Sequence, residues 1–154
     1  MKAIKLLFNT SNSCAPLLAR LTLGLVMFPH GAQKALGWFG GYGFSGTMNF
    51  FEQQMHIPAP LAFLAIAAEF AGSLGLIFGC LSRIAAFGIA TNMVVAIITV
   101  HSANGFFMNW YGTQKGEGFE YHLLAIGLAL IVIIHGAGKA SIDALIAKRL
   151  DAKK

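Results

Sequence analysis

The stretch that decides the fold class is residues 59–80, APLAFLAIAAEFAGSLGLIFGC, in which Glu69 is the only charged side chain. An α-helix needs about 20 mostly apolar residues to cross a hydrocarbon core roughly 30 Å thick. Pro58 and Pro60 flank the start of the stretch, where a first helical turn tolerates proline. We therefore expect residues 59–80 to cross a membrane as one helix.

Three further stretches of similar length and apolarity lie on either side of this one. They are residues 16–38, 84–103 and 119–137. Ser13 and Ser82 precede the first and third of them, where a serine oxygen can cap a helix. Together the four stretches predict an all-α integral membrane protein, a four-helix bundle that occupies residues 1–154 as a single domain.

The composition agrees with a membrane protein. Hydrophobic residues make up 56% of the chain and charged residues 11%, with a mean hydropathy of +0.68, whereas ordinary soluble domains carry about 25% charged residues. These values exclude a water-soluble globule, a disordered chain and a disulfide-rich scaffold. The formal charge of +5 comes from residues at the ends of apolar runs. That distribution favours contact with anionic lipid headgroups and argues against a nucleic-acid partner.

The positions of the basic residues predict the orientation, because cytoplasmic connections carry an excess of lysine and arginine. Eight basic residues fall on one predicted side, and Lys115 alone falls in a connection on the other. The eight are Lys2, Lys5, Arg83, Lys139, Lys148, Arg149, Lys153 and Lys154. We therefore expect both termini to be cytoplasmic, in a multi-pass protein of the bacterial inner membrane. Residues 141–154, which begin with a capping Ser141, are expected to form an amphipathic helix on the membrane surface.

Ionisable side chains within a span cost roughly 2.5–3.5 kcal/mol on the insertion scale, so Arg20, Lys34 and Glu69 are candidate functional residues. The helical period places Arg20 and Lys34 on one stripe of the first span, together with glycines, and we expect this stripe to face the bundle. Glu69 needs a partner, and either Arg20 or Lys34 could supply it. The pair either fixes helix register or belongs to a proton or cofactor site.

More polar side chains are expected at the end of the bundle opposite the termini. The group contains three histidines and two glutamates, namely His30, His101, His122, Glu117 and Glu120. Such residues could ligate a metal or a haem. However, Glu120 and His122 differ by about 200° around a helix and cannot both face one centre, so no metal site is assigned. The candidate intramembrane site comprises Arg20, His30, Lys34, Glu69, His101 and Glu120.

Cys14 and Cys80 both fall near the cytoplasmic side and form no Cys-x-x-Cys motif, which makes thiol redox chemistry an unfavoured explanation. Gly75 and Gly79 are spaced four positions apart. This spacing indicates close helix packing first and a homo-oligomer second.

Several segments together resemble the DoxX family of small four-helix membrane proteins. They are the first-span pattern from Arg20 to Lys34 with Phe28-Pro29-His30-Gly31, then Ala68-Glu69-Phe70-Ala71-Gly72, Gly79-Cys80-Leu81-Ser82-Arg83, and Gly138-Lys139-Ala140-Ser141-Ile142-Asp143. The resemblance implies a four-helix bundle in the bacterial inner membrane with both termini inside, and polar positions at Arg20, Lys34, Glu69 and Arg83. Some relatives look like membrane subunits of thiosulfate:quinone oxidoreductases, and others are associated with redox complexes or with the handling of membrane proteins.

Three functions remain open. The first is a membrane subunit of a quinone-linked oxidoreductase, with the quinone near Lys34, His30 or Glu69 and haem as the second choice of cofactor. A membrane or peripheral protein would have to donate the electrons, because the chain has no flavin or iron–sulfur motif. The second is a non-enzymatic module that binds or assembles other membrane proteins. The third is a small transporter, for which four helices leave little room unless the protein oligomerises.

Overall fold

The structure, a computed structural model, describes residues 2–152, with side chains from Lys5 onward, and this part of the chain contains helices and no strand. The α-helices are α1 (Lys2–Phe8), α2 (Cys14–Leu36), α3 (Gly43–Asn49), α4 (Ala59–Phe78), α5 (Ser82–Ala96), α6 (Glu120–His135) and α7 (Ile142–Asp151). A π-helical turn, η3 (Ile97–His101), and a 3-10 turn, η4 (Ser102–Asn104), continue α5. The all-α prediction is therefore confirmed.

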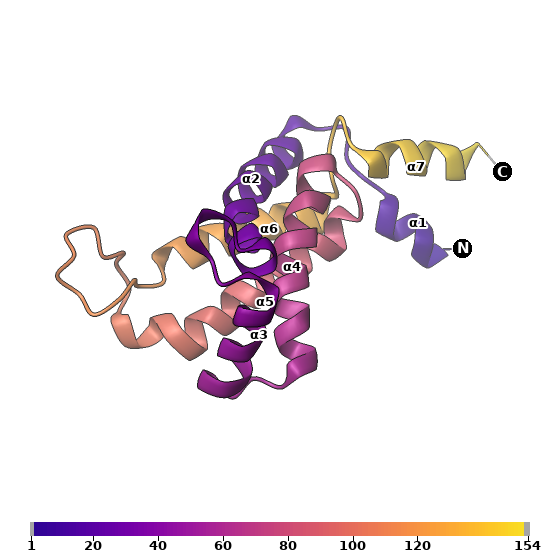
Figure 1. The fold of residues 1–154 in the computed structure, drawn as a ribbon. Coiled ribbons are helices and arrows are strands. Elements are labelled where there is room, and N and C mark those ends of the chain that lie inside the picture. The colour runs from indigo at the N-terminus through magenta and orange to yellow at the C-terminus, as the bar shows by residue number, and fades with distance from the viewer. Residues whose placement is uncertain (1, 153–154) are drawn as a thin grey trace.

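Four helices pack around one apolar core. Helix α2 packs against α4 and α6, and α5 packs against the same two helices (Figure 1). The core is filled by Leu23, Met27, Leu76, Ile89 and Val132. The outward faces are also apolar, with side chains such as Phe87, Ile98 and Leu124 at least 64% exposed. Such faces would be poorly solvated by water, and they suit contact with lipid chains.

Three helical stretches are long and apolar enough to cross a membrane: Cys14–Leu36, Ala59–Phe78 and Ser82–Asn104. They agree with the predicted spans 16–38, 59–80 and 84–103 to within two residues at each end. The predicted span 119–137 corresponds to α6, an apolar helix of 16 residues. At 1.5 Å per residue α6 is about 24 Å long. It ends at Gly136, whose φ of 75° terminates the helix.

The helix caps agree with the sequence at two positions and differ at a third. Ser13 and Ser141 cap α2 and α7, their Oγ atoms accepting hydrogen bonds from the amides of Ala15 and Ala144 at 3.2 Å. The prediction that Ser82 caps the third span is wrong. The residue before α5 is Leu81, and the Asp143 carboxylate accepts its N–H and that of Ser82 at 2.8 and 2.9 Å.

Both described chain ends lie on the same side of the helices, where α1 packs beside α7 (Figure 1). An ion pair between Lys5 Nζ and Asp151 Oδ1, 2.6 Å apart, joins these two helices. Helix α7 falls within the predicted surface helix 141–154. Of the basic residues that predict the orientation, Lys153, Lys154 and the side chain of Lys2 lie outside the described part of the structure. We call this side the terminal end.

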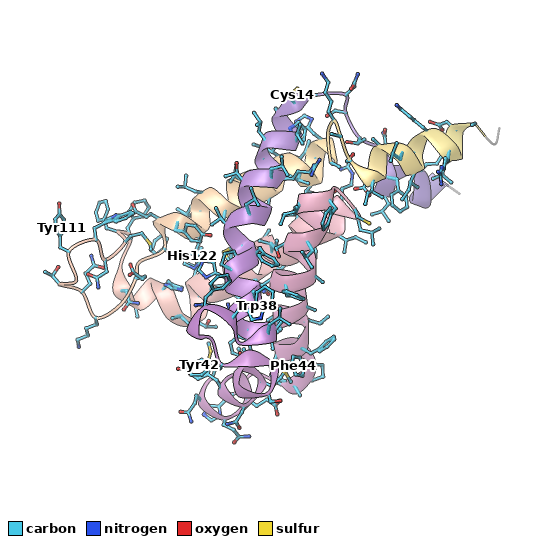
Figure 2. All side chains as sticks on the ribbon, turned by 45° about the horizontal axis from the view of Figure 1, so that its top comes forward. Cys14, Trp38, Tyr42, Phe44, Tyr111 and His122 are labelled. Carbon is cyan, nitrogen blue, oxygen red and sulfur yellow. The ribbon has the colours of Figure 1, made fainter. Side chains whose placement is uncertain are left out.

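The two long connections lie at the opposite end of the helices. Residues 39–58 contain α3 and a π-helical turn, Phe50–Gln54. This connection is rich in aromatic residues and is helical over much of its length, so it is not an unstructured linker. Residues 105–119 form a loop that projects from the helices, and Tyr111 marks its tip (Figure 2). His122, by contrast, lies within the group of helices. The two connections border the space in which the candidate residues meet.

Candidate functional site

A cavity of about 400 Å³ lies between α2, α4, α5 and α6 at the end opposite the termini. Its polar or ionisable lining residues are His30, Lys34, Glu69, Asn92, Thr99, His101, Glu117, Tyr121 and His122. The rest of the lining is mainly apolar, with Met27, Met93 and Met108 among its side chains. The cavity therefore combines an apolar wall with a small set of polar groups, which is the usual composition of a small-molecule site.

Lys34 and Glu69 form an ion pair across α2 and α4, and this contact settles which basic residue pairs with Glu69. Glu69 is 7% exposed, so its carboxylate needs a partner. The approach of the two helices depends on Gly31, one turn before Lys34. A Cβ at Gly31 would lie 2.6 Å from the backbone of Phe70, far inside contact distance. The glycine thus lets the lysine reach the carboxylate.

His101 and His122 face each other from η3 and α6, with ring centroids 4.1 Å apart. His101 Nδ1 lies 2.8 Å from the backbone carbonyl oxygen of Glu117. His122 is 6% exposed, and among the described residues its Nδ1 has no hydrogen-bond partner. A buried polar nitrogen without a partner is unusual in a folded protein. It marks this part of the cavity as a place where a ligand atom could bind.

Two other polar side chains of the cavity have their donors engaged. Asn92 Nδ2 donates to the carbonyl of Ala65 at 2.7 Å and links α5 to α4. The Tyr121 hydroxyl donates to Met27 Sδ at 3.4 Å and links α6 to α2. These bonds hold the four helices in register around the cavity. The Lys34–Glu69 ion pair and the histidines are therefore the groups that can bind a ligand in the cavity.

Arg20 lies at the terminal end, about 21 Å along α2 from Lys34 at 1.5 Å per residue, and does not line the cavity. Arg20 is 1% exposed, and each of the five N–H groups of its guanidinium has an acceptor. The acceptors are the carbonyls of Ala137, Leu76, Ile77, Lys139 and Ala140, at 2.6–3.2 Å. Arg20 thus joins the end of α4 to the segment after α6, and the structure does not bring it together with the other candidates.

Arg83 and Asp143 are further polar residues of the terminal end, and Arg83 Nε is buried without a partner among the described residues. Arg83 donates to the carbonyls of Ile133 and Ile134 at the end of α6 and to that of Asn9. Asp143, 2% exposed, caps α5. Cations at helix carboxyl ends and an anion at a helix amino end are favoured by the helix dipole. We call Arg20, Arg83 and Asp143 the terminal cluster.

Glu120 also lies outside the cavity lining, because its Oε1 accepts the N–H of Met108 at 2.9 Å and so fastens the projecting loop to the first turn of α6. This confirms that Glu120 and His122 face different centres. No group of three His, Cys, Asp or Glu side chains that could hold a metal occurs in residues 2–152.

Of the six predicted site residues, the cavity brings together His30, Lys34, Glu69 and His101 and leaves out Arg20 and Glu120. His122 takes the place that the sequence analysis gave to Glu120. The sequence named His122 among the polar residues of this end, and helical angle alone could not choose between the two. Asn92 and Tyr121 carried no signal in the sequence, because a lone polar residue or tyrosine in an apolar helix is common.

The DoxX family model matches residues 15–102, which run from the start of α2 to the first residue of η4. The chain belongs to the DoxX family. The matched segment contains His30, Lys34, Glu69 and His101, whereas His122 lies beyond it. The predicted family is thereby confirmed.

Relatives of this DoxX protein occur in several bacteria. "Inner membrane protein YqjF" of Escherichia coli is 32% identical over 73% of this chain and 82% of its own length. "Putative oxidoreductase CatD" of Bacillus subtilis is 30% identical over 79% of this chain and 81% of its own. An "Uncharacterized protein" of Haemophilus influenzae is 30% identical over 86% of this chain and 83% of its own. No solved structure matches. With three helices able to span a membrane, this DoxX protein is a bacterial inner-membrane protein in contact with lipid.

Proposed function

We propose that this DoxX protein is a membrane subunit of a quinone-linked redox complex and that the quinone ring binds in the cavity between α2, α4, α5 and α6. The observation that carries the proposal is the cavity itself, which places Lys34, Glu69 and three histidines in a mainly apolar wall between membrane helices. A quinone likewise combines a few polar groups with an apolar body, since its two carbonyl oxygens are attached to an apolar ring and tail.

The residues present fit this ligand. The volume of about 400 Å³ lies within the range of about 300–1,000 Å³ that small-molecule pockets occupy. Lys34 Nζ has three donors and uses one on Glu69, so it can also donate to a carbonyl oxygen. His122 Nδ1, buried and without a partner among the described residues, is a second polar contact. When bound, a quinone supplies two-electron redox chemistry, which this chain's own side chains lack.

The electrons would come from a membrane or peripheral partner protein, because the sequence has no flavin or iron–sulfur motif. The relative in Bacillus subtilis whose name includes "oxidoreductase" supports a redox role. In the proposed arrangement α2, α4, α5 and α6 form a four-helix membrane bundle, residues 1–154 are one domain, and both termini are cytoplasmic. The cavity then opens near the outer face.

A second candidate is a binding or assembly module, as a single subunit or a homo-oligomer. The observation in its favour is the projecting loop, on which Trp110 and Tyr111 are 80% and 92% exposed. Exposed aromatic side chains are enriched at protein interfaces and also at the membrane–water boundary. This function requires no ligand in the cavity.

The deciding experiment is a lipid-extract mass spectrum of the gently purified full chain, followed by titration with decylubiquinone. We expect quinone to co-purify and decylubiquinone to bind. In the double variant Lys34→Met with Glu69→Gln, binding should weaken by about tenfold, the equivalent of one lost charge-assisted hydrogen bond. Glu52→Gln, outside the cavity lining, is the matched control. Absence of any quinone in the extract and of binding by the wild type would move the assignment to the assembly module.

A further inference from the structure

The hydrogen bond of His101 fixes which of its nitrogens carries the proton. A backbone carbonyl can only accept, so Nδ1, which lies 2.8 Å from the Glu117 carbonyl oxygen, must be the donor. In a neutral imidazole one nitrogen is a donor and the other an acceptor. Neutral His101 therefore leaves Nε2 as an unprotonated acceptor, and His101 is one of the residues that line the cavity.

The neighbouring His122 limits how many protons the two rings hold. The ring centroids are 4.1 Å apart, and His122 is 6% exposed. Two imidazolium charges at that separation would repel each other in a poorly solvated site. We therefore expect the pair to take up one proton in total. The two rings differ in access to water, since His101 is half-buried and adjoins the exposed Glu117.

The other ionisable groups around the cavity are less suited to exchange a proton. They are Lys34 and His30 on α2, Glu69 on α4, Glu117 on the projecting loop, and Tyr121 and His122 on α6. Lys34 and Glu69 are engaged with each other. The Glu117 carboxylate accepts the N–H of Asn109 at 2.6 Å, and the Tyr121 hydroxyl donates to Met27. Among the described residues the ring of His30 packs against no other histidine ring, whereas His101 has both a fixed tautomer and an adjoining surface group.

We propose that His101 is the residue through which the cavity exchanges protons with its ligand. Neutral His101 accepts a hydrogen bond at Nε2 from a ligand hydroxyl, and protonated His101 donates one from Nε2 to a ligand carbonyl. This inference rests on the proposed function. Reduction of a bound quinone consumes two electrons, supplied by the redox centre of the partner protein, and two protons. His101 delivers protons one at a time from the aqueous side next to Glu117 and is reprotonated there.

The test compares the binding of decylubiquinone and decylubiquinol to the full chain in lipid nanodiscs between about pH 5 and pH 8, where imidazoles titrate. Protonated His101 favours the carbonyl form and neutral His101 the hydroxyl form. We therefore expect the ratio of the two dissociation constants to change by about tenfold across this range, as one charge-assisted hydrogen bond is exchanged. In His101→Asn, whose amide keeps a donor toward the Glu117 carbonyl, the ratio should not vary with pH. His135→Asn, at the other end of α6, should behave as the wild type.

Each alternative outcome has a separate meaning. A ratio that is independent of pH in the wild type, or one that becomes flat in His122→Asn but not in His101→Asn, overturns the assignment of His101 while leaving quinone binding intact. Failure of the wild type to bind either compound contradicts the proposed function itself. Nitrogen NMR of histidine-labelled wild type needs no ligand and no variant. It should show neutral His101 protonated at Nδ1, and the Nε2-protonated form would overturn the inference even if His101→Asn failed to fold.

Discussion

Arg20 and Asp143 of the terminal cluster differ from the polar groups of the cavity in how their hydrogen bonds are satisfied, whereas Nε of Arg83, the third member, is buried and has no partner among the described residues. At the terminal end every N–H of the Arg20 guanidinium has a carbonyl acceptor, and the Asp143 carboxylate accepts two backbone amides. In the cavity, Lys34 and Glu69 bind each other from two helices, and His122 Nδ1 has no partner among the described residues. Lys34, Glu69 and His122 line the cavity, whereas Arg20, Arg83 and Asp143 are not among its lining residues.

This difference separates two uses of intramembrane charge. A buried ion whose hydrogen bonds all go to backbone holds helix ends together, and a ligand would have to displace those bonds to reach it. A buried pair beside a cavity keeps hydrogen-bonding capacity for a ligand. The presence of charge within a span therefore does not by itself indicate a functional site, and the satisfaction of its hydrogen bonds is the more informative property.

The largest expected effect comes from breaking the terminal cluster with Arg20→Met. Five carbonyls that now bind the guanidinium would lose their donor in a poorly solvated place. We expect the free energy of unfolding to fall by roughly 3–5 kcal/mol, as it does when other buried polar networks are broken. Equilibrium denaturation in detergent measures this. A loss below about 1 kcal/mol would show that the helix ends do not depend on Arg20.

The next effect concerns the cavity pair. Lys34→Met and Glu69→Gln each leave the other partner without its counter-ion, and we expect each to destabilise by about 2–3 kcal/mol. The double variant has no buried charge left, so its stability should return to within about 1 kcal/mol of the wild type, while quinone binding stays weak. If the double variant is as unstable as the single variants, the pair is as structural as the terminal cluster, and the comparison between the two regions fails.

A smaller effect is expected for Asp143→Asn. The amide keeps one acceptor for the amino end of α5 but loses the second acceptor and the charge. We expect a loss of about 1–2 kcal/mol with ligand binding unchanged. Asp151→Asn, on an exposed ion pair with Lys5, is the matched control and should cost about 0.5 kcal/mol or less. Equal losses in the two variants would contradict the capping role.

The smallest effect is expected for Glu52→Gln compared with Glu69→Gln. Glu52 lies in the connection after α3 and only Glu69 is buried in a span. The Glu52 variant should remain within about 0.5 kcal/mol of the wild type. Thermal unfolding of the two single variants side by side is the measurement. Similar midpoints for both would mean that the burial of Glu69 carries no cost.

Much of the fold could be predicted from the sequence, because it depends on local patterns. Apolar length gave the spans, and the period of the helix placed Arg20 on one stripe with glycines, of which Gly24 and Gly31 are buried together with Arg20. The role of Ser82 was mistaken because a serine at the start of a helix is a local signal, whereas the actual cap comes from Asp143, 61 residues later. Contacts of that separation leave no trace in a local pattern.

The types of residue in the candidate site could be predicted from the sequence. Which individual residues meet in the cavity was harder to predict. Depth along the membrane brought His30, Lys34 and His101 to one end, as the structure does. Depth could not decide whether Glu69 meets Arg20 or Lys34, since that choice depends on how closely α2 approaches α4 at Gly31. It also could not select His122 over Glu120, which requires the rotation of α6 about its axis.

The bonds of Arg20 have a consequence for biosynthesis. Its acceptors lie between Leu76 and Ala140, so the last of them is made 120 residues after the arginine. At about 5–20 residues per second, that interval is roughly 6–24 s. Throughout it the first span holds a guanidinium whose native acceptors have not all been synthesised. Until the carboxyl-terminal segment arrives, the guanidinium needs water or another temporary acceptor, so we expect the first span to be held less firmly in nascent chains that end before Ala137.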